Sequence, residues 1–259
     1  AQSIFQLGGN AGSAIGPLLV ALVVAPYGQS YVIWFVIAGV LGIMILSRIA
    51  LWYENHMSLR AAKKSGLEEA VPLSNRKITI SIIVLLLLIF SKFFYMASMS
   101  SYFTFYLMSK FSLDIQESQY YLFIFLASVA AGTLIGGPLG DHFGRKYIIW
   151  FSILGAAPFT LLLPYANLFW TGVLAVIIGI VIASAFSAIL VYAQELKPGK
   201  VGMISGLFFG FAFGMGGLGS AILGYIADKT SIEYVYTISS YLPLIGVLAY
   251  FLPNIQTKK

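Results

Sequence analysis

One lysine, Lys92, lies in the middle of a long apolar stretch of the chain, within FSKFFYMASMSSYF at residues 90–103. Inside a bilayer a lysine costs at least about 2.5–3.5 kcal/mol on insertion scales, so it indicates a binding function or an ion pair. An ammonium group among aromatic rings and hydroxyls suits an amphiphilic anion. We predict a substrate site at four residues, Lys92, Tyr95, Ser98 and Tyr102. The alternative is a structural ion pair between Lys92 and a carboxylate on another helix.

A second polar stretch, GPLGDHFGRKYII at residues 137–149, combines three glycines with four charged or titratable side chains between apolar segments. Gly137 and Gly140 have no side chain, so two helix ends can approach closely there. Gly144 suits a tight turn that needs a positive φ angle. The pattern predicts a sharp turn between two packed helices.

The charged residues of this turn predict ion pairing. Asp141 can cap the following helix or pair with a basic group, and Arg145 and Lys146 can hold carboxylates of a neighbouring helix. Glu195 ends a later apolar stretch, directly after VYAQ. We predict that Glu195 pairs with Arg145 or with a nearby lysine. The alternative is that Glu195 carries a proton.

A third pattern is the glycine-rich segment GGNAGSAIGPLL at residues 8–19. Gly8, Gly12 and Gly16 are four residues apart, so they share one face of a helix. Pro17 can bend that helix. Because a face without side chains lets two backbones approach closely, we predict that this face packs against another helix. The alternative is ordinary packing of small residues.

The composition of the chain places these patterns in a membrane. Of 259 residues, 59% are hydrophobic and only 9% are charged, whereas a soluble domain has about 25% charged residues. So few charges cannot cover the surface of a globular protein in water. The net charge of +6 is the usual excess of cytoplasmic Lys and Arg in a membrane protein, and it does not indicate nucleic acid.

The residues that catalysis and metal binding require are missing from the sequence. The chain has no cysteine, and its two histidines, His56 and His142, lie far apart. No nucleophile motif, phosphate-binding loop or metal-ligand spacing is found in it. We therefore expect neither an enzyme nor a metal or other cofactor.

A membrane-spanning helix needs about 20 mostly apolar residues, and the chain has eight such stretches. They lie at about residues 3–25, 31–53, 78–109, 117–139, 147–166, 168–194, 202–226 and 233–253. The links are short except for residues 54–77, which are polar and mixed in charge. We predict an all-α, polytopic membrane protein in which residues 54–77 connect two bundles.

Lys and Arg are distributed unevenly over these links. Eleven lie on one alternate set of links and at the C-terminus, and two lie on the opposite set. The larger set is Arg60, Lys63, Lys64, Arg76, Lys77, Arg145, Lys146, Lys197, Lys200, Lys258 and Lys259, and the smaller is Lys110 and Lys229. Because cytoplasmic loops carry the excess of Lys and Arg, we predict that the linker, the 137–149 turn and both chain ends are cytoplasmic.

A faint internal repeat relates the two parts of the chain. Residues 12–35 and 214–237, offset by 202 residues, each contain a glycine-rich helix, a short turn and an aromatic helix. Parallel six-span repeats of about this size are a known architecture. We predict that residues 78–259 form a complete C-terminal six-helix half and that residues 1–53 are the last two helices of the other half. Four further spans are then expected before residue 1.

The turn at 137–149 closely resembles the loop motif of the major facilitator superfamily, G-x-L-x-D-[RK]-x-G-R-[RK]-x-x-[IL]. The matching residues are Gly137, Leu139, Asp141, Gly144, Arg145, Lys146 and Ile149, and His142 departs from the motif. In that family the loop follows the second helix of each half. The resemblance implies a cytoplasmic latch that stabilises one access state; the alternative is a turn that only sets topology. Residues 8–19 resemble, in part, the glycine–proline motif of the antiporter branch.

Residues 90–108, 184–219 and 228–236 resemble the bacterial fosmidomycin-resistance efflux proteins, and the resemblance runs along the whole chain. It implies helices 5 to 12 of a twelve-helix fold. It further implies a monomeric secondary transporter of the bacterial inner membrane that exports a small drug such as fosmidomycin, an anionic phosphonate, by proton antiport and alternating access. The expected partners are this substrate, protons and the lipid bilayer.

Two alternatives to this function remain open. One is an importer or symporter of organic anions on the same fold, since fold does not determine the direction of transport. The other is a membrane module that transports nothing. No acidic residue of this chain lies convincingly at mid-membrane, so we expect the proton-carrying carboxylate in the preceding helices.

Overall fold

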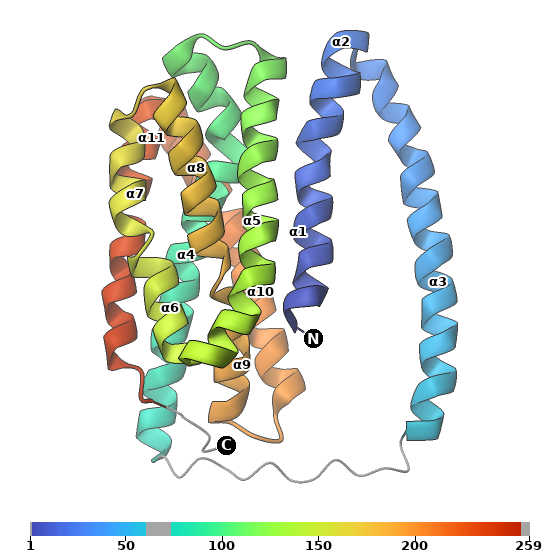
Figure 1. Cartoon of the computed structure of the whole chain (residues 1–259), viewed down its shortest axis with the longest axis vertical. Coiled ribbons are helices and arrows are strands. Elements are labelled where there is room, and N and C mark those ends of the chain that lie inside the picture. Colours follow the sequence, from blue (N-terminus) through green and yellow to red (C-terminus); the bar gives the residue numbers. More distant parts are fainter. Residues whose placement is uncertain (1, 61–73, 255–259) are drawn as a thin grey trace.

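The structure, a computed structural model, describes residues 2–60 and 74–254 and is helical throughout them (Figure 1). Eight helical stretches within these residues are long and apolar enough to cross a membrane. They are Gln6–Tyr27, Gln29–Tyr53, Asn75–Phe111, Ile115–Phe143, Arg145–Tyr165, Leu168–Leu196, Val201–Lys229 and Ile232–Phe251. The predicted all-α architecture with eight spans is therefore confirmed. Most of the predicted linker, with Lys63 and Lys64, and the terminal Lys258 and Lys259 lie outside the described residues.

The first two spans form a helical hairpin. The first comprises α1 (Gln2–Leu19), the π-helical η1 (Val20–Val24) and the short α2 (Ala25–Tyr27), and the second comprises the 3-10 helix η2 (Gln29–Trp34) and α3 (Phe35–Arg60). Gly28 separates them with a φ angle of 99°.

The other six spans form a bundle. Its helices are α4 (Asn75–Phe111), α5 (Ile115–Phe143), α6 (Arg145–Leu154), α7 (Ala157–Leu162), α8 (Leu168–Ala183), α9 (Phe186–Leu196), α10 (Val201–Lys229) and α11 (Ile232–Ser239), with the 3-10 helices η3 (Leu163–Tyr165) and η4 (Leu242–Phe251). Three of these six spans are therefore built from more than one helical segment. The span from Leu168 to Leu196 is interrupted at Ser184 and Ala185, between α8 and α9.

The connections alternate between the two ends of the molecule. The α5–α6 and α9–α10 connections lie at one end, and the α4–α5 and α10–α11 connections lie at the other (Figure 1). Gly144 forms the α5–α6 turn with a φ angle of 93°, as predicted. The alternation agrees with the predicted grouping of Lys and Arg, whereas the assignment of one end to the cytoplasm stays a prediction.

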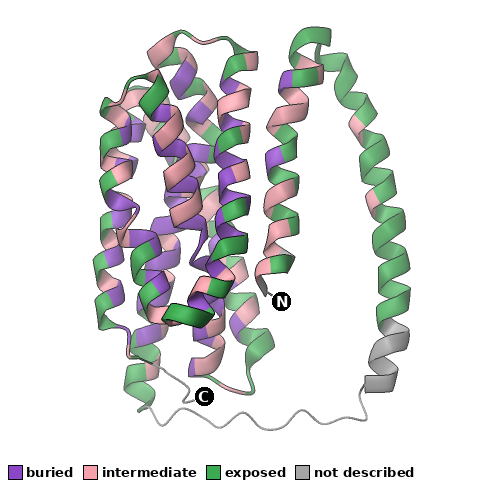
Figure 2. Cartoon of the chain, viewed as in Figure 1, coloured by how far each residue is buried: buried purple, intermediate pink, exposed green. Residues whose placement is uncertain are grey.

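Within the described residues, most of the buried residues lie inside the six-span bundle (Figure 2), and the first span of the hairpin packs against it. α1 packs along α5, where Ser3, Asn10 and Ala14 lie on the contact face. α3 has no buried residue between Phe35 and Tyr53 and stands apart from the bundle (Figure 1). Its apolar side chains are distributed around the helix, as in a helix that faces lipid or other protein on all sides.

The predicted close packing of the Gly8, Gly12 and Gly16 face stays a prediction, because no described residue covers that face. A Cβ atom added at any of these glycines would have no neighbour within 4 Å. At 100° per residue this face points about 180° away from the face of α1 that carries Ser3, Asn10 and Ala14 and packs on α5. Both faces are made of small residues, and the regular spacing alone does not show which of them another helix will cover.

Close backbone packing occurs between α5 and the span formed by α8 and α9. Gly132 lies against the backbone of Ile180, and Gly136 lies against the backbone of Ser184. An added Cβ at either glycine would overlap with backbone atoms of its partner. Glycines four residues apart thus do bring two helices together, as such a pattern predicts, but on α5 rather than on α1.

Candidate functional site

Lys92 occupies the middle of α4, about 26 Å along a helix that begins at Asn75. Its side chain is only 4% exposed. Among the described residues the Nζ atom has no hydrogen-bond partner and no ion pair. Its nearest charge-stabilising neighbours are two rings, with centroids 5.3 Å away at Phe186 and 5.8 Å away at Phe93. The helix therefore holds a buried lysine whose only described charge-stabilising neighbours are aromatic rings.

Two of the other three predicted substrate residues, Ser98 and Tyr102, form structural hydrogen bonds. Ser98 donates a hydrogen bond to the carbonyl oxygen of Tyr95 at 2.7 Å and accepts one at its own carbonyl from the Tyr236 hydroxyl at 3.0 Å. The Tyr102 hydroxyl donates to the carbonyl of Ser220 on α10 at 2.6 Å. Tyr95 is buried, and its hydroxyl has no partner among the described residues.

Lys92 does not lie together with the other three predicted substrate residues. Ser98 lies about 120° from Lys92 around the helix, and Tyr102 about 80°. Tyr95 packs in a different part of the core, with Met99, Tyr106 and Tyr236. The structure instead places Lys92 with Phe93 and Phe186.

The sequence interpretation missed Phe186. Phe186 is the first residue of α9 and comes directly after the interruption at Ser184 and Ala185. Interrupted helices near mid-membrane commonly line binding sites, because the positive end of the second half-helix faces the site. Neither glycine nor proline marks this interruption in the sequence. Phe186 lies against Lys92 only because α4 packs against α9.

The second candidate site is the charged turn between α5 and α6. Arg145 forms an ion pair with Glu195 at the end of α9, as predicted. Its Nη2 atom also lies 3.9 Å from Oδ1 of Asp141, so Asp141 pairs with a basic group instead of capping α6, whose first turn has no side-chain cap. Lys146 contacts no carboxylate among the described residues and donates to the carbonyl of Tyr250 at 3.2 Å.

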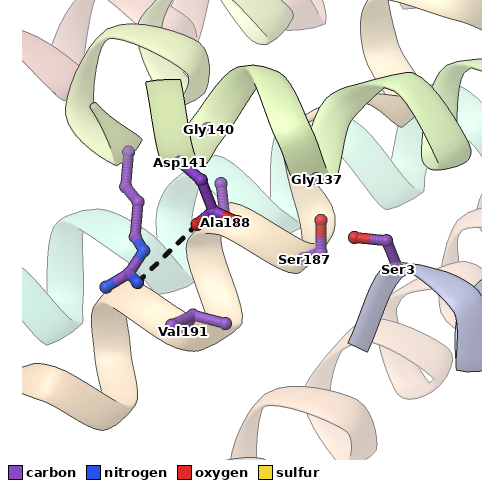
Figure 3. Close-up of a pocket in the computed structure, with 8 residues that line it drawn as sticks. Ser3, Gly137, Gly140, Asp141, Ser187, Ala188 and Val191 are labelled. Atoms are coloured by element: carbon purple, nitrogen blue, oxygen red, sulfur yellow. Dashed lines mark ion pairs between the residues drawn. The ribbon is translucent and has the colours of Figure 1, made fainter. Parts of the chain in front are cut away.

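This turn meets the hairpin at a small cavity of about 90 Å³ (Figure 3). Ser3 of α1 and Ser187 of α9 face it from opposite sides, and its lining also includes Gly137, Gly140, Asp141, Arg145, Ala188 and Val191. Ser3 packs directly on Gly137. Seven residues further along α1, Asn10 donates a hydrogen bond to Thr133 at 2.7 Å. The ion pair therefore lies at the place where the hairpin and the bundle meet.

Comparison with known proteins identifies the family. The sequence matches the Major Facilitator Superfamily over residues 1–219 and again over residues 90–259. The chain belongs to the major facilitator superfamily. This superfamily consists of membrane transporters and not of enzymes, so the chain is a multi-pass membrane protein of a transporter family. The loop motif, the all-α fold and the eight spans agree with this membership.

Two bacterial members of the superfamily are similar along the whole chain. The fosmidomycin resistance protein of Escherichia coli is 62% identical over 259 residues, which are all of this chain and 63% of the relative. An uncharacterized MFS-type transporter of Bacillus subtilis is 42% identical over 261 residues, covering 99% of this chain and 63% of the relative. The chain thus spans 63% of the length of these two relatives.

Proposed function

We propose that the chain is part of a secondary transporter that exports a small drug such as fosmidomycin, by proton antiport and alternating access. The observation that carries the proposal is Lys92, a buried lysine within a membrane-length helix with no described counter-ion. Keeping such a group has a free-energy cost that an apolar residue would avoid, and an anionic ligand would offset it. The similarity to the fosmidomycin resistance protein suggests the drug, since fosmidomycin is a phosphonate.

The ion pair between Arg145 and Glu195 is the proposed latch. It ties the beginning of α6 to the end of α9, beside the cavity where α1 meets α5. The intact pair fixes the α5–α6 turn against α9, next to the place where Ser3 of α1 packs on Gly137, and so keeps this end closed. Separation of the hairpin from the bundle would open that end and expose the cavity that Ser3 and Ser187 line.

The arrangement of the whole transporter belongs to the same proposal. Residues 78–259 form one six-helix half and residues 1–53 the last two helices of the other, joined by residues 54–77. The transporter is a monomer of the bacterial inner membrane, with the linker, the 137–149 turn and the C-terminus in the cytoplasm. The carboxylate that carries the proton lies outside this chain.

The experiment that tests this function uses the full-length protein in inverted membrane vesicles. Wild type, Lys92→Met and Lys92→Arg are given a proton gradient and fosmidomycin, and both drug uptake and dissipation of the gradient are recorded. We expect wild type to couple the two, Lys92→Met to lose both, and Lys92→Arg to keep part of each. Lys229→Met, which changes an exposed lysine outside the site, serves as the control.

Each other result has a definite meaning. Normal transport by Lys92→Met would remove Lys92 from the substrate site. Uptake of fosmidomycin together with protons in the same direction would favour the importer or symporter. If wild type moved no drug and left the gradient unchanged, the proposed substrate would be wrong.

A further inference from the structure

The Phe186 and Phe93 rings that face Lys92 belong to a closed cluster of four phenylalanines. Neighbouring ring centroids are 5.1 Å apart for Phe93 and Phe186, 5.4 Å for Phe186 and Phe209, 6.3 Å for Phe209 and Phe213, and 6.4 Å for Phe213 and Phe93. The cluster joins three helices, since Phe93 lies on α4, Phe186 on α9 and the other two on α10.

Exposure increases steadily across this cluster. Lys92 is 4% exposed and Phe186 7%, Phe93 and Phe209 are partly exposed, and Phe213 is 71% exposed. The Phe93–Phe186 pair therefore separates the lysine from the open side at Phe213. A ligand that reaches Lys92 from that side has to push these two rings apart. The portion of the ligand that stays outside the two rings lies against Phe209 and Phe213.

We infer that Phe209 and Phe213 form an apolar wall that selects the substrate of the Lys92 site by the length of its apolar body. This inference rests on the proposed function. The ligand class is a small organic anion with its charged head at one end and an alkyl or aryl body at the other. The head takes the place of the rings at Nζ, where a direct charge pair is stronger than a cation–π contact. The body is removed from water or lipid by the two outer rings.

If Phe209 and Phe213 form this wall, the affinity of a ligand should increase with the length of its alkyl chain. Each fully buried methylene adds about 0.8 kcal/mol, which corresponds to about a fourfold gain in affinity. Methylphosphonate carries the head alone, whereas hexylphosphonate adds five methylenes that can contact the rings. With partial burial, we expect wild type to bind hexylphosphonate at least about tenfold more tightly than methylphosphonate.

The test measures the dissociation constants of methylphosphonate and hexylphosphonate by titration calorimetry on the purified full-length protein. Phe213→Ala should leave the dissociation constant of methylphosphonate unchanged and reduce the tenfold preference for hexylphosphonate to about twofold. Phe213→Leu should give an intermediate ratio of the two constants. The matched control is Phe105→Ala, which removes another exposed ring, 58% exposed, from a site outside the cluster. A thermal unfolding curve for each variant shows that it is folded.

The outcomes distinguish this inference from the proposed function. An unchanged preference in Phe213→Ala, or equal weakening of both ligands, would overturn the apolar wall and leave the anion site at Lys92 intact. If wild type bound neither phosphonate, the anion site itself would be wrong. If Phe105→Ala also reduced the preference for hexylphosphonate, any exposed ring would contribute to binding of the alkyl chain. That result would also contradict a specific wall at Phe209 and Phe213.

Discussion

Gly136 of α5 lies directly against the backbone of Ser184, at the point where the span from Leu168 to Leu196 is interrupted. No side chain fits between these two backbones, so the position of α9, and with it that of Phe186, depends on the absence of a Cβ at residue 136. The contact links helix packing to the candidate site, because Phe186 faces Lys92.

Gly136→Ala is therefore expected to destabilise the protein. An added Cβ would overlap with backbone atoms of Ser184, and overpacking of this kind costs about 1–3 kcal/mol. Gly140→Ala is the matched control, because its Cβ would lie at an ordinary distance of 3.6 Å from the Ala188 Cβ. Thermal unfolding of the full-length protein in detergent measures both. Equal stability of the two variants would contradict the close packing.

Glu195→Gln is expected to open the end of the protein at the α5–α6 turn. It removes the ion pair with Arg145, and a loss of about 1 kcal/mol shifts a two-state population about fivefold. Ser187 is buried in the cavity beside the pair, so a Ser187→Cys variant in a background without other reactive cysteines reports opening. We expect its labelling by a maleimide to be about fivefold faster with Glu195→Gln.

The control for this experiment is Lys200→Gln, which changes an exposed charge at the same end of the protein without touching the pair. Its labelling rate should stay at that of Ser187→Cys alone. If Glu195→Gln also left the rate unchanged, the ion pair would not act as a latch.

Lys92→Met is expected to raise the thermal stability of the ligand-free protein while abolishing transport. The methionine keeps most of the side-chain length and removes a buried cation that has no described counter-ion. We expect the unfolding midpoint to rise by at least about 2 °C, and Lys92→Arg, which keeps the charge, not to raise it. A lower midpoint for Lys92→Met would instead indicate a structural ion pair with a carboxylate elsewhere in the transporter.

Lys110→Met is expected to destabilise the opposite end of the bundle. The Lys110 ammonium donates to the carbonyls of Pro164 at 2.7 Å and Ala166 at 3.0 Å, and to the Tyr106 hydroxyl at 3.0 Å. It thus satisfies carbonyl oxygens where the span from Arg145 to Tyr165 ends. The loss should be about 1–3 kcal/mol, measured by thermal unfolding, with Lys229→Met as a control of little effect. A midpoint equal to that of wild type would show that water replaces these bonds.

The amino-acid sequence by itself determined the membrane class, the eight spans and the sharp turn at Gly144. These features follow from local chemistry: apolar length sets a span, and a positive φ angle favours glycine. An ion pair of Glu195 with Arg145 or a nearby lysine was also predictable, because these opposite charges end neighbouring spans on the same side of the membrane, and the structure selects Arg145.

Only the tertiary structure decided which faces of the helices meet. Glycines four residues apart occur on α1 and on α5, and the spacing shows that they share a face but not whether another helix covers it. For the same reason the sequence grouped Lys92 with its neighbours along α4, whereas packing placed it against Phe186 of α9. Side chains close in sequence diverge around a helix by 100° per residue, so a site inside a bundle is assembled mainly from different helices.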